Sequence, residues 1–533
     1  MPEWAWEVSM KKYTNLIVIG VILVGIAGFL VYKNVNFNDV LMSLGYYDQK
    51  ISVVNTADMH GHICFDNESG GYYTLDQVDV MMGMPLVKYF IDEVKNDNKN
   101  TLVLDSGDMF HGTNEANIEK AKGVVETVNL MGYDAMTMGN HDFDFGIDRA
   151  IEFKTDLNFP IICANVLRDG KPIYEEYRIV EMGGLKVALF GTVEKNALID
   201  TNSRDHKGVV IEDPMITAQR IIPVLKEQSD LIIYISHNGD EIDREIVKKV
   251  DGIDLVLCGH HHFLYEEPDR VNDSYLVEAG GYTTHVGLAD LYLKDGKVKK
   301  CTWKVFNTRD NSKANKEMQK IAQKYEALAM EAGKEVVGKA TVKLNGMRSD
   351  LRFKETNLAD LLADAMRETG KADIALMNGG GIRESIPEGD ISLYKIGKVL
   401  PFTNSLVTIE LKGEDIYKCL ERGIMQYPNS GANGGFLQVS GITFSFDASK
   451  PAGERVVSVK TLDGKELDKN KAYKVSTNDY LYNGGDGYEE MVDAKLIYKG
   501  ELLKDVLAKY IKEKGAVAPK EEGRISVVNE RYK

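Results

Sequence analysis

Five short apolar runs in the first half of the chain each end in a polar turn that carries carboxylate, amide or imidazole groups. The runs are Ile51–Thr56 before Ala-Asp-Met-His-Gly, Thr101–Leu104 before Asp-Ser-Gly-Asp, Ala135–Met138 before Gly-Asn-His-Asp, Leu231–Ser236 before His-Asn-Gly, and Leu255–Cys258 before Gly-His-His-His. One such turn is common by chance and usually holds solvated side chains. Five in order favour a shared site.

The donor types in these turns suit divalent metal ions. All ten histidines lie at or before His285. The side chains concerned are His60, His62, His141, His237, His260 and His262, with Asp58, Asp105, Asp108, Asn140, Asp142 and Asp144 in or beside the same turns. Carboxylate, imidazole and amide ligands together suit two hard or borderline ions, such as Zn²⁺ or Mn²⁺.

An alternation of strands and helices would bring these turns together. Helical patterns such as Gly83–Asn96 and Asn114–Met131 lie between the apolar runs. This order predicts an α/β fold with a largely buried sheet. Because the carboxyl ends of strands in such a sheet converge on one edge, the polar turns should meet there.

The second half of the chain begins with a different pattern. Residues 311–339 are rich in Ala, Glu, Lys and Gln, and Ile321, Tyr325 and Leu328 give one apolar stripe at helical spacing. We interpret 311–335 as a helix that connects two domains, residues 50–310 and residues 336–527. The second domain should open with a helix near Leu358–Arg367 and a strand at Ile374–Met377.

The second domain carries arginines, aromatics and glycine-rich turns. Asn378-Gly-Gly-Gly-Ile-Arg383 lacks the Gly-Lys-Ser/Thr ending of a phosphate-binding P-loop, which argues against a kinase or ATPase. Arg348 and Arg352 flank a short turn, Phe402 follows a proline, and Tyr480 precedes Asn-Gly-Gly-Asp486-Gly. Each of these alone is a weak signal, because such residues are usually surface, core or turn residues.

Composition narrows the classes of partner. The chain has 533 residues and a net charge of −16, which argues against an extended nucleic-acid surface. Its five cysteines are spread out and include no Cys-x-x-Cys pair. A disulfide framework or a cysteine zinc site is therefore not expected, although a single disulfide is compatible with the spacing. The oligomeric state cannot be read from the sequence.

The amino terminus contains a membrane-type segment. Leu16–Tyr32 is an uncharged run of 17 residues that follows Lys11 and Lys12. We expect residues 1–33 to be a cytoplasmic stub and uncleaved signal anchor, and 34–49 to be a linker. The catalytic domains would then be extracytoplasmic at the cell membrane, or secreted if the segment is a cleaved signal. Met10 is an alternative start.

The ordered set Asp-x-His-Gly, Gly-Asp, Gly-Asn-His-Asp, His-x-Gly and Gly-His-x-His resembles that of dinuclear metallophosphoesterases. With the second-half motifs, residues 50–525 resemble the 5'-nucleotidase family. The resemblance implies a calcineurin-like metallophosphoesterase sandwich, a connecting helix and a carboxy-terminal α/β nucleotide-binding domain. It also implies metal ligands at Asp58, His60, Asp108, Asn140, His237, His260 and His262, with Asp108 bridging both ions.

The resemblance assigns a catalytic dyad to His141 and Asp144, in which the carboxylate holds the imidazole near the developing charge. Two metals about 3.5–4 Å apart would activate a water between them. The implied substrate residues are Arg348, Arg352, Asn378, Arg383, Phe402, Tyr480 and Asp486, with Phe402 and Tyr480 on either side of the base. The chain departs from common family choices at His262, where many members have Gln, and at Tyr480, where Phe is frequent.

The expected reaction is hydrolysis of nucleoside 5'-monophosphates to nucleoside and phosphate. UDP-sugars, nucleoside di- or triphosphates and 2',3'-cyclic nucleotides are alternative substrates of the same family. A surface binding protein without turnover is a third hypothesis, which predicts gaps in the metal set, and none occurs. The substrate would bridge both domains, so domain closure would accompany turnover.

Other polar residues are expected to play lesser parts. Asp105 should support Asp108, and His62 should be a supporting or solvated turn residue. His261 should point away from its neighbours if its turn is extended. His111 and His285 are interpreted as ordinary loop histidines.

Overall fold

The computed structural model describes residues 36–65, 73–74, 77–78, 80–198, 206–428, 434–492 and 494–529. The predicted anchor Leu16–Tyr32 lies outside the described residues. Among the helices in those ranges, none is both long and apolar enough to cross a bilayer.

The apolar runs of the first half become strands of two sheets that pack face to face. In spatial order, sheet 1 holds β16 (Lys297–Phe306), β15 (Val286–Lys294), β1 (Gln49–Thr56), β4 (Thr101–Asp105) and β5 (Ala135–Met136). Sheet 2 holds β13 (Asp269–Val271), β14 (Ser274–Val277), β12 (Leu255–Leu257), β11 (Leu231–His237), β9 (Leu185–Val193) and β8 (Tyr177–Met182). Between the sheets lies one apolar core, to which Ile51, Leu104, Ile233 and Leu257 belong.

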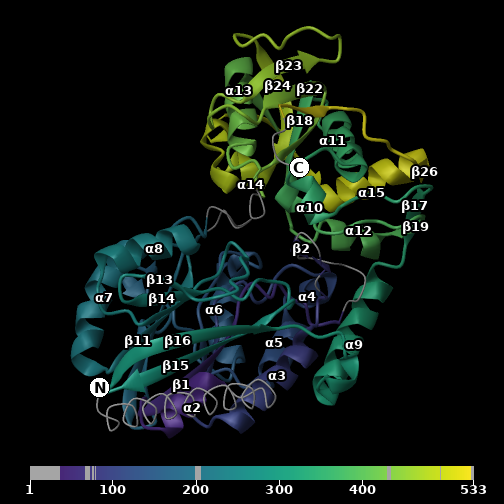
Figure 1. The fold of residues 1–533 in the computed structure, drawn as a ribbon. Coiled ribbons are helices and arrows are strands. Elements are labelled where there is room, and N and C mark those ends of the chain that lie inside the picture. Colours follow the sequence, from purple (N-terminus) through teal and green to yellow (C-terminus); the bar gives the residue numbers. More distant parts are fainter. Residues whose placement is uncertain are drawn as a thin grey trace, which may run out of the picture.

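Helices cover the outer faces of both sheets, which gives a four-layer sandwich (Figure 1). Helices α3 (Met84–Asp97), α5 (Lys122–Val128) and α6 (Ile147–Asp156) pack on sheet 1, and α7 (Pro214–Gln228) and α8 (Asp240–Lys249) pack on sheet 2. The α/β fold class predicted from the sequence is confirmed. The sandwich that the family resemblance implies is present, with the buried strands divided between two sheets that share one core.

The helical pattern over Asn114–Met131 is interrupted. The chain forms α4 (Asn114–Asn117) and then α5, because Glu119, Lys120 and Ala121 have φ of 50°, 52° and 68°. A helix cannot continue through left-handed backbone. Helix α4 is therefore short and separate from α5, and its side chains contact the second half of the chain.

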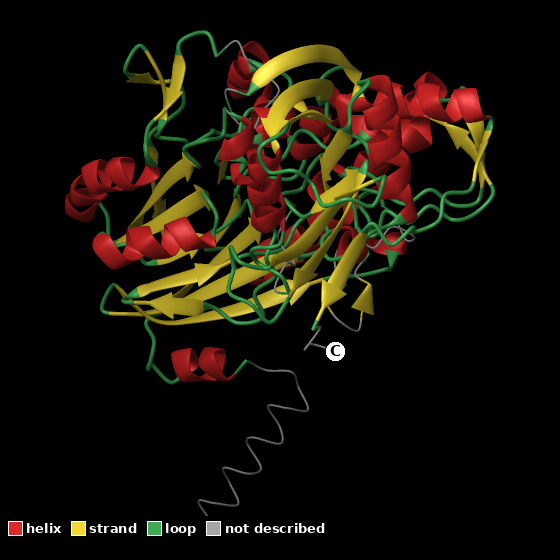
Figure 2. Ribbon diagram, turned by 90° about the horizontal axis from the view of Figure 1, so that it is seen from above, coloured by secondary structure: helices red, strands yellow, loops and turns green. Residues whose placement is uncertain are grey.

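The second half is built around sheet 3, with helices on both faces (Figure 2). Sheet 3 holds β21 (Leu437–Ser440), β18 (Ile374–Asn378), β24 (Ala472–Asn478), β20 (Ser405–Lys412) and β25 (Lys495–Leu502). Helices α11 (Asn357–Thr369) and α15 (Leu503–Lys514) share one core, and α13 (Gly413–Gly423) belongs to the other. Two smaller sheets of this half are β19 (Gly389–Ser392)–β17 (Val336–Ala340)–β26 (Ala516–Val517) and β23 (Val456–Thr461)–β22 (Ile442–Asp447)–β27 (Ile525–Val528).

The first half also has two small sheets, β10 (Val209–Ile211)–β6 (Val166–Arg168)–β7 (Lys171–Pro172) and β2 (Tyr73–Thr74)–β3 (Gln77–Val78).

Helix α9 (Lys316–Ala332) lies between the two halves, at the position where the sequence pattern predicts a connecting helix. Of its buried residues, Met318, Ala322 and Tyr325 belong to the core of the first half. A Cβ on Gly123 of α5 would lie 2.6 Å from the Tyr325 ring, so the two helices need glycine to approach this closely. Most of the helix is therefore docked on the first half, while Gly333 at its end accepts from the Tyr394 N–H of the second half at 2.8 Å.

Polar contacts through α4 also join the two halves. Asn114 Nδ2 donates to the Tyr394 carbonyl at 2.7 Å, and Asn117 Nδ2 donates to the Pro401 carbonyl at 3.0 Å. The Tyr394 hydroxyl donates to Glu115 at 2.8 Å. These bonds connect α4 with α12 (Leu393–Val399) and with the loop that follows it.

Candidate metal and substrate site

Five predicted metal ligands have left-handed backbone. They are Asp58 (φ 51°), His60 (46°), Asp108 (55°), His260 (84°) and His262 (59°). This conformation is uncommon for residues other than glycine, and it gathers where function requires it. Each residue directly follows a strand end or lies in the turn beyond it, so the sharp bend turns its side chain toward the gap where the two sheets meet.

The seven predicted metal-binding side chains lie in one cluster. On one side, His60 Nε2 lies 3.4 Å from His262 Nε2, which in turn lies 3.5 Å from Asp58 Oδ1. On the other side, His237 Nε2 lies 3.2 Å from Asn140 Oδ1, and His260 Nδ1 lies 3.0 Å from the same oxygen.

Asp108 lies between these two groups. Its Oδ2 is 3.5 Å from His60 Nε2 and 3.3 Å from His237 Nε2. The donor sets Asp58–His60–His262 and Asp58–Asp108–His237 each have their ligand atoms within 4.8 Å of one another. The cluster can thus hold divalent ions on either side of one carboxylate.

The orientation of the imidazoles fits metal ligation. His60 Nδ1 lies 2.9 Å from the His111 carbonyl, and His237 Nδ1 lies 2.7 Å from the Ser106 carbonyl. A carbonyl can only accept, so Nδ1 carries a hydrogen in both rings and Nε2 is the ring atom that faces the Asp108 carboxylate. A metal ion between these groups would take the place of a proton on Nε2.

The buried charges in the cluster favour a cation as well. Burial and the neighbouring Asp108 raise the pKa of Asp58 to about 7. Burial alone would lower the pKa of His237, but the carboxylates of Asp108 and Asp58 raise it to about 10. Positive charge is therefore strongly stabilised where these three side chains meet.

Two further carboxylates hold the turns in shape. Asp142 accepts the backbone N–H groups of Gly139, Asp108, Met109 and Phe110 at 2.8–3.0 Å. Asp105 accepts from the Thr56 hydroxyl at 2.6 Å and from Gly107 N–H at 2.9 Å. The supporting part predicted for Asp105 matches this geometry.

His141 and Asp144 are in direct contact. His141 Nδ1 lies 2.8 Å from Asp144 Oδ2, and the His141 backbone N–H donates to Asp108 at 2.7 Å. Burial would lower the pKa of His141, but the carboxylates of Asp144 and Asp108 raise it. Burial would likewise raise the pKa of Asp144, but His111 and His141 lower it to about 2. An ionised Asp144 thus supports a protonated His141.

His111 is a residue that sequence reasoning undervalues. Its sequence context suggests an ordinary loop histidine, yet it is fully buried and its Nδ1 lies 3.0 Å from Asp144 Oδ2. In the sequence, only its position three residues after Asp108 indicates that it lies near the donor cluster. Asp144 therefore contacts two imidazoles.

The expectation for His261 is wrong. It lines the same cavity as His260 and His262, with Nδ1 3.3 Å from Asp240 Oδ1. The left-handed backbone of its two neighbours removes the alternation that an extended turn would give. His62 contacts the Met59 carbonyl at 3.0 Å and the Tyr282 ring, outside the cluster, and His285 contacts the Thr284 hydroxyl at 3.1 Å.

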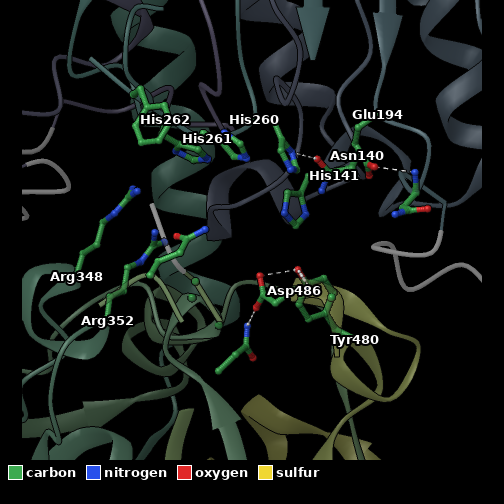
Figure 3. Close-up of a pocket in the computed structure, with 18 of the residues that line it drawn as sticks. Asn140, His141, Glu194, His260, His261, His262, Arg348, Arg352, Tyr480 and Asp486 are labelled. Atoms are coloured by element: carbon green, nitrogen blue, oxygen red, sulfur yellow. Dashed lines mark hydrogen bonds between the residues drawn. The ribbon is translucent and has the colours of Figure 1, made fainter. Parts of the chain in front are cut away.

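A cavity of about 920 Å³ lies between the two halves of the chain. Its first wall includes Asp108, Asn140, His141, Asp144, His260 and His262, and its second wall includes all seven predicted substrate residues, Arg348, Arg352, Asn378, Arg383, Phe402, Tyr480 and Asp486. Figure 3 shows His141 and His260 facing Tyr480 and Asp486 across this space. Asp58, His60 and His237 lie buried behind the first wall.

The second wall contains a small polar network around Asp486. The Tyr480 hydroxyl donates to Asp486 Oδ1 at 3.1 Å, and Asn378 Nδ2 donates to Asp486 Oδ2 at 3.0 Å. Asn478 in turn donates to Asn378 at 2.9 Å. The Tyr480 hydroxyl thereby has the partner that a partly buried tyrosine requires.

Arg383 and Phe402 reach across to the first wall. The Arg383 guanidinium lies between the rings of Tyr282 and Phe402, at 5.0 and 5.1 Å from their centroids, and bonds to the Tyr282 hydroxyl. Tyr282 has φ of 55°, and its ring packs on His60 and His262. Phe402 stacks on His141, with centroids 4.8 Å apart and an interplanar angle of 19°.

Three arginines concentrate positive charge on the second wall. Burial lowers the pKa of Arg348 and of Arg383 to about 10 each. Burial and the nearby Arg348 hold the pKa of Arg352 well below its usual range. Such crowding of cations favours a bound anion, and the guanidinium fork matches phosphate geometry.

Comparison with known families covers both halves of the chain. Residues 51–264 match the calcineurin-like phosphoesterase family, and residues 336–494 match the 5'-nucleotidase carboxy-terminal domain. The crystal structure of a 5'-nucleotidase precursor from Thermus thermophilus is 30% identical and covers 90% of this chain and 100% of its own, with a TM-score of 0.78.

Two relatives carry related activities in their names. The trifunctional nucleotide phosphoesterase of Bacillus subtilis is 32% identical over 497 residues, which are 82% of this chain but 33% of that protein. The chain thus spans about a third of that relative. The human 5'-nucleotidase is 28% identical, over 89% of this chain and 90% of its own.

Fold and site together define a phosphoesterase whose donor cluster fits divalent metals. The chain belongs to the 5'-nucleotidase family and is a phosphoric ester hydrolase.

Proposed function

We propose that this protein hydrolyses nucleoside 5'-monophosphates to nucleoside and phosphate. The observation that carries the proposal is the single cavity with two unlike walls: a metal-type donor cluster beside the His141–Asp144 pair on one side, and arginines with aromatic rings on the other. In a nucleoside monophosphate, the phosphate ester would match the donor cluster and the flat base would match the aromatic rings.

One metal ion would be held by Asp58, His60 and His262. The other ion would be held by Asn140, His237 and His260, and Asp108 would contact both ions. Bound Zn²⁺ or Mn²⁺ would supply Lewis-acid activation of the nucleophile and of the phosphoryl group. The chain's own part is to aim Nε2 of His60 and of His237 at the metal positions through their Nδ1 contacts with backbone carbonyls.

His141 supplies positive charge next to the reacting phosphoryl group. With Nδ1 on Asp144, its Nε2 is the ring atom that can carry a proton toward the cavity. An imidazolium there stabilises charge that develops on a phosphoryl or leaving-group oxygen. Asp144 keeps that charge in place without changing its own ionisation.

The second wall would bind the nucleoside. Arg348, Arg352 and Arg383 are proposed to bind phosphate and ribose, and Asp486 to accept from ribose hydroxyls. A base between Phe402 and Tyr480 would replace the present stack of Phe402 on His141. Because the two stacked rings, Phe402 and His141, belong to different halves, binding requires a movement of one half relative to the other.

The cellular setting is also a proposal. The run Leu16–Tyr32 with its preceding lysines supports attachment to the cell membrane, with the catalytic halves on the extracytoplasmic side. If that segment is cleaved, the enzyme is secreted.

Phosphate release from the purified full chain tests the function. The protein is prepared without chelator, supplied with Mn²⁺ or Zn²⁺, and assayed with AMP, UMP, UDP-glucose, ATP and 2',3'-cyclic AMP. We expect the highest kcat/KM with a monophosphate, and loss of both activity and bound metal in Asp108→Ala. A preference for the diphosphate sugar, triphosphate or cyclic ester would replace the proposed substrate. No release from any of them with metal bound would overturn the proposal.

A further inference from the structure

The first described helix contacts the rest of the protein through polar side chains. In α2 (Phe37–Ser43), the polar residues face the protein: Asn36 donates to the Tyr292 hydroxyl at 2.9 Å, and Asp39 accepts from that hydroxyl at 2.9 Å and from Lys50 at 3.1 Å. None of its residues is buried. A helix that packs on a globular core normally turns its apolar side inward.

Large apolar side chains at both ends of α2 are exposed. Phe37 and Leu44 are spaced i and i+7, so they lie on one side of the helix, with the half-buried Leu41 between them. Phe37 is 60% exposed, Leu44 76% and Tyr46 63%. Single exposed apolar residues are common on protein surfaces, but three around one short helix form a patch.

Exposed lysines lie beside this patch. Lys294 contacts the Gly45 carbonyl and Asp48, and Lys297 is its cross-strand partner in the β15–β16 hairpin. Lys300 pairs with Tyr292, whose hydroxyl contacts α2, and cross-strand partners share a face of the sheet. Lys294 and Lys50 pair with Asp48 and Asp39, whereas Lys297 and Lys300 are exposed at the same end of the molecule, where they can reach anionic groups.

The position of α2 in the chain identifies what can cover the patch. The apolar run ends at Tyr32, and Asn36 follows four residue steps later. Four steps span at most about 14 Å. If the run lies in a bilayer, α2 must therefore lie within about 14 Å of the end of that run.

We propose that Phe37, Leu44 and Tyr46, with Lys294, Lys297 and Lys300, form a basal surface that lies on an anionic lipid bilayer. Aromatic and aliphatic side chains enter the boundary between headgroups and acyl chains, and the lysines contact the headgroups. The inference rests on the proposed membrane attachment and adds an orientation to it. Figure 1 shows α2 at one end of the molecule and the second half of the chain at the other, so the interdomain cavity lies away from the lipid.

A fluorescent probe on the full chain tests the contact. Leu44→Cys in a Cys64→Ser background carries an environment-sensitive label, since the other four cysteines are buried. The control is Leu462→Cys, a leucine of similar exposure, 73%, near β23 in the second half. Both proteins are reconstituted in vesicles of phosphatidylcholine and phosphatidylglycerol that contain a lipid spin-labelled near the headgroup.

We expect a blue shift and loss of emission for the label at position 44, protection from aqueous iodide, and neither effect at position 462. Phe37→Ser with Tyr46→Ser, or Lys294→Glu with Lys297→Glu, should restore part of the lost emission without changing nucleotide hydrolysis. These residues lie outside the cavity, so unchanged hydrolysis also reports correct folding.

Other outcomes separate the possible failures. If the chain floats with the vesicles but both labels behave alike, the basal surface is wrong while membrane attachment stands. If the label at 44 is shielded from iodide yet unaffected by spin-labelled lipid, protein covers the patch, either a second copy or the chain's own segment, and the lipid contact is wrong. If the chain does not float, attachment and basal surface both fail, and phosphate release still judges the catalytic proposal.

Discussion

The contact between Asp144 and two imidazoles allows a quantitative prediction. The pKa of Asp144 is held at about 2, against an ordinary 3.8, by His111 and His141 despite burial. At about 1.36 kcal/mol per pKa unit, this difference of about 1.8 corresponds to about 2.4 kcal/mol of net charge stabilisation. Because burial opposes this shift, the two imidazoles together supply at least this amount, and an equal share for the His141 contact is at least about 1.2 kcal/mol.

The variant Asp144→Asn keeps the shape of the side chain and removes its charge. Loss of about 1.2 to 2.4 kcal/mol of support for the imidazolium predicts a fall in kcat of roughly 8- to 60-fold, with little change in KM. The carboxylate raises the pKa of His141, so its removal lowers that pKa. If the protonated ring is the active form, the alkaline limb of the kcat–pH profile must move to lower pH.

Steady-state phosphate release across a pH series measures both effects. Asp169→Asn, an exposed turn residue with φ of 52°, is the matched control because asparagine tolerates that backbone. Thermal unfolding of both variants reports whether the fold is intact. A kcat within about twofold of the parent at the pH optimum, with an unmoved alkaline limb, would refute the assigned role of the pair.

Three other perturbations test separate parts of the site. Tyr480→Ala removes a stacking face worth about 1–3 kcal/mol and should raise KM for AMP roughly 5- to 150-fold, with a smaller effect on kcat. Tyr480→Phe keeps the ring and should keep KM near the parent value. Equal effects of the two substitutions would contradict stacking of the base on this ring. Asn114→Cys with Gly397→Cys should form a disulfide between the halves, because a Cβ on Gly397 would lie 3.0 Å from Asn114 Cγ. Turnover should stop when this variant is oxidised and return when it is reduced. Full activity of the oxidised form would exclude the proposed movement of the two halves. Gly139→Ala would place a Cβ 2.2 Å from Asp108 Oδ1 and should therefore lower the bound metal per chain, which elemental analysis measures; an unchanged metal content would show that the loop can yield.

The polar turns after strands were predictable because they follow simple local rules. The apolar run and the turn beyond it identify Asp58, Asp108 and His237 without knowledge of which sheet each strand joins. The structure brings these residues together at the meeting point of two sheets rather than at the edge of one. Strand ends converge in both arrangements, so these residues lie close together however the strands divide between the sheets.

Contacts that depend on unusual backbone or on the other half of the chain were not predictable. His261 was misplaced because alternation fails where its neighbours have positive φ. The break between α4 and α5 has the same cause. Tyr282 shows no motif, and its role in joining Arg383 to the His60–His262 pair emerges only when both halves are packed together. Sequence periodicity describes one segment at a time and contains no information on contacts between distant segments of the chain.

The division of the cavity between two halves of the chain has a consequence for product release. For the proposed reaction, an intact substrate is a bivalent ligand, whose phosphate reaches the donor cluster of the first wall while its nucleoside is held by the second wall. Each contact raises the effective concentration of the second, so the whole binds more tightly than its parts. Cleavage of the phosphate ester severs that link: the nucleoside keeps only the second wall, and the phosphate loses the contacts that it held through the nucleoside. The chemical step itself thus weakens retention of both products, and the two halves are free to separate for the next turnover.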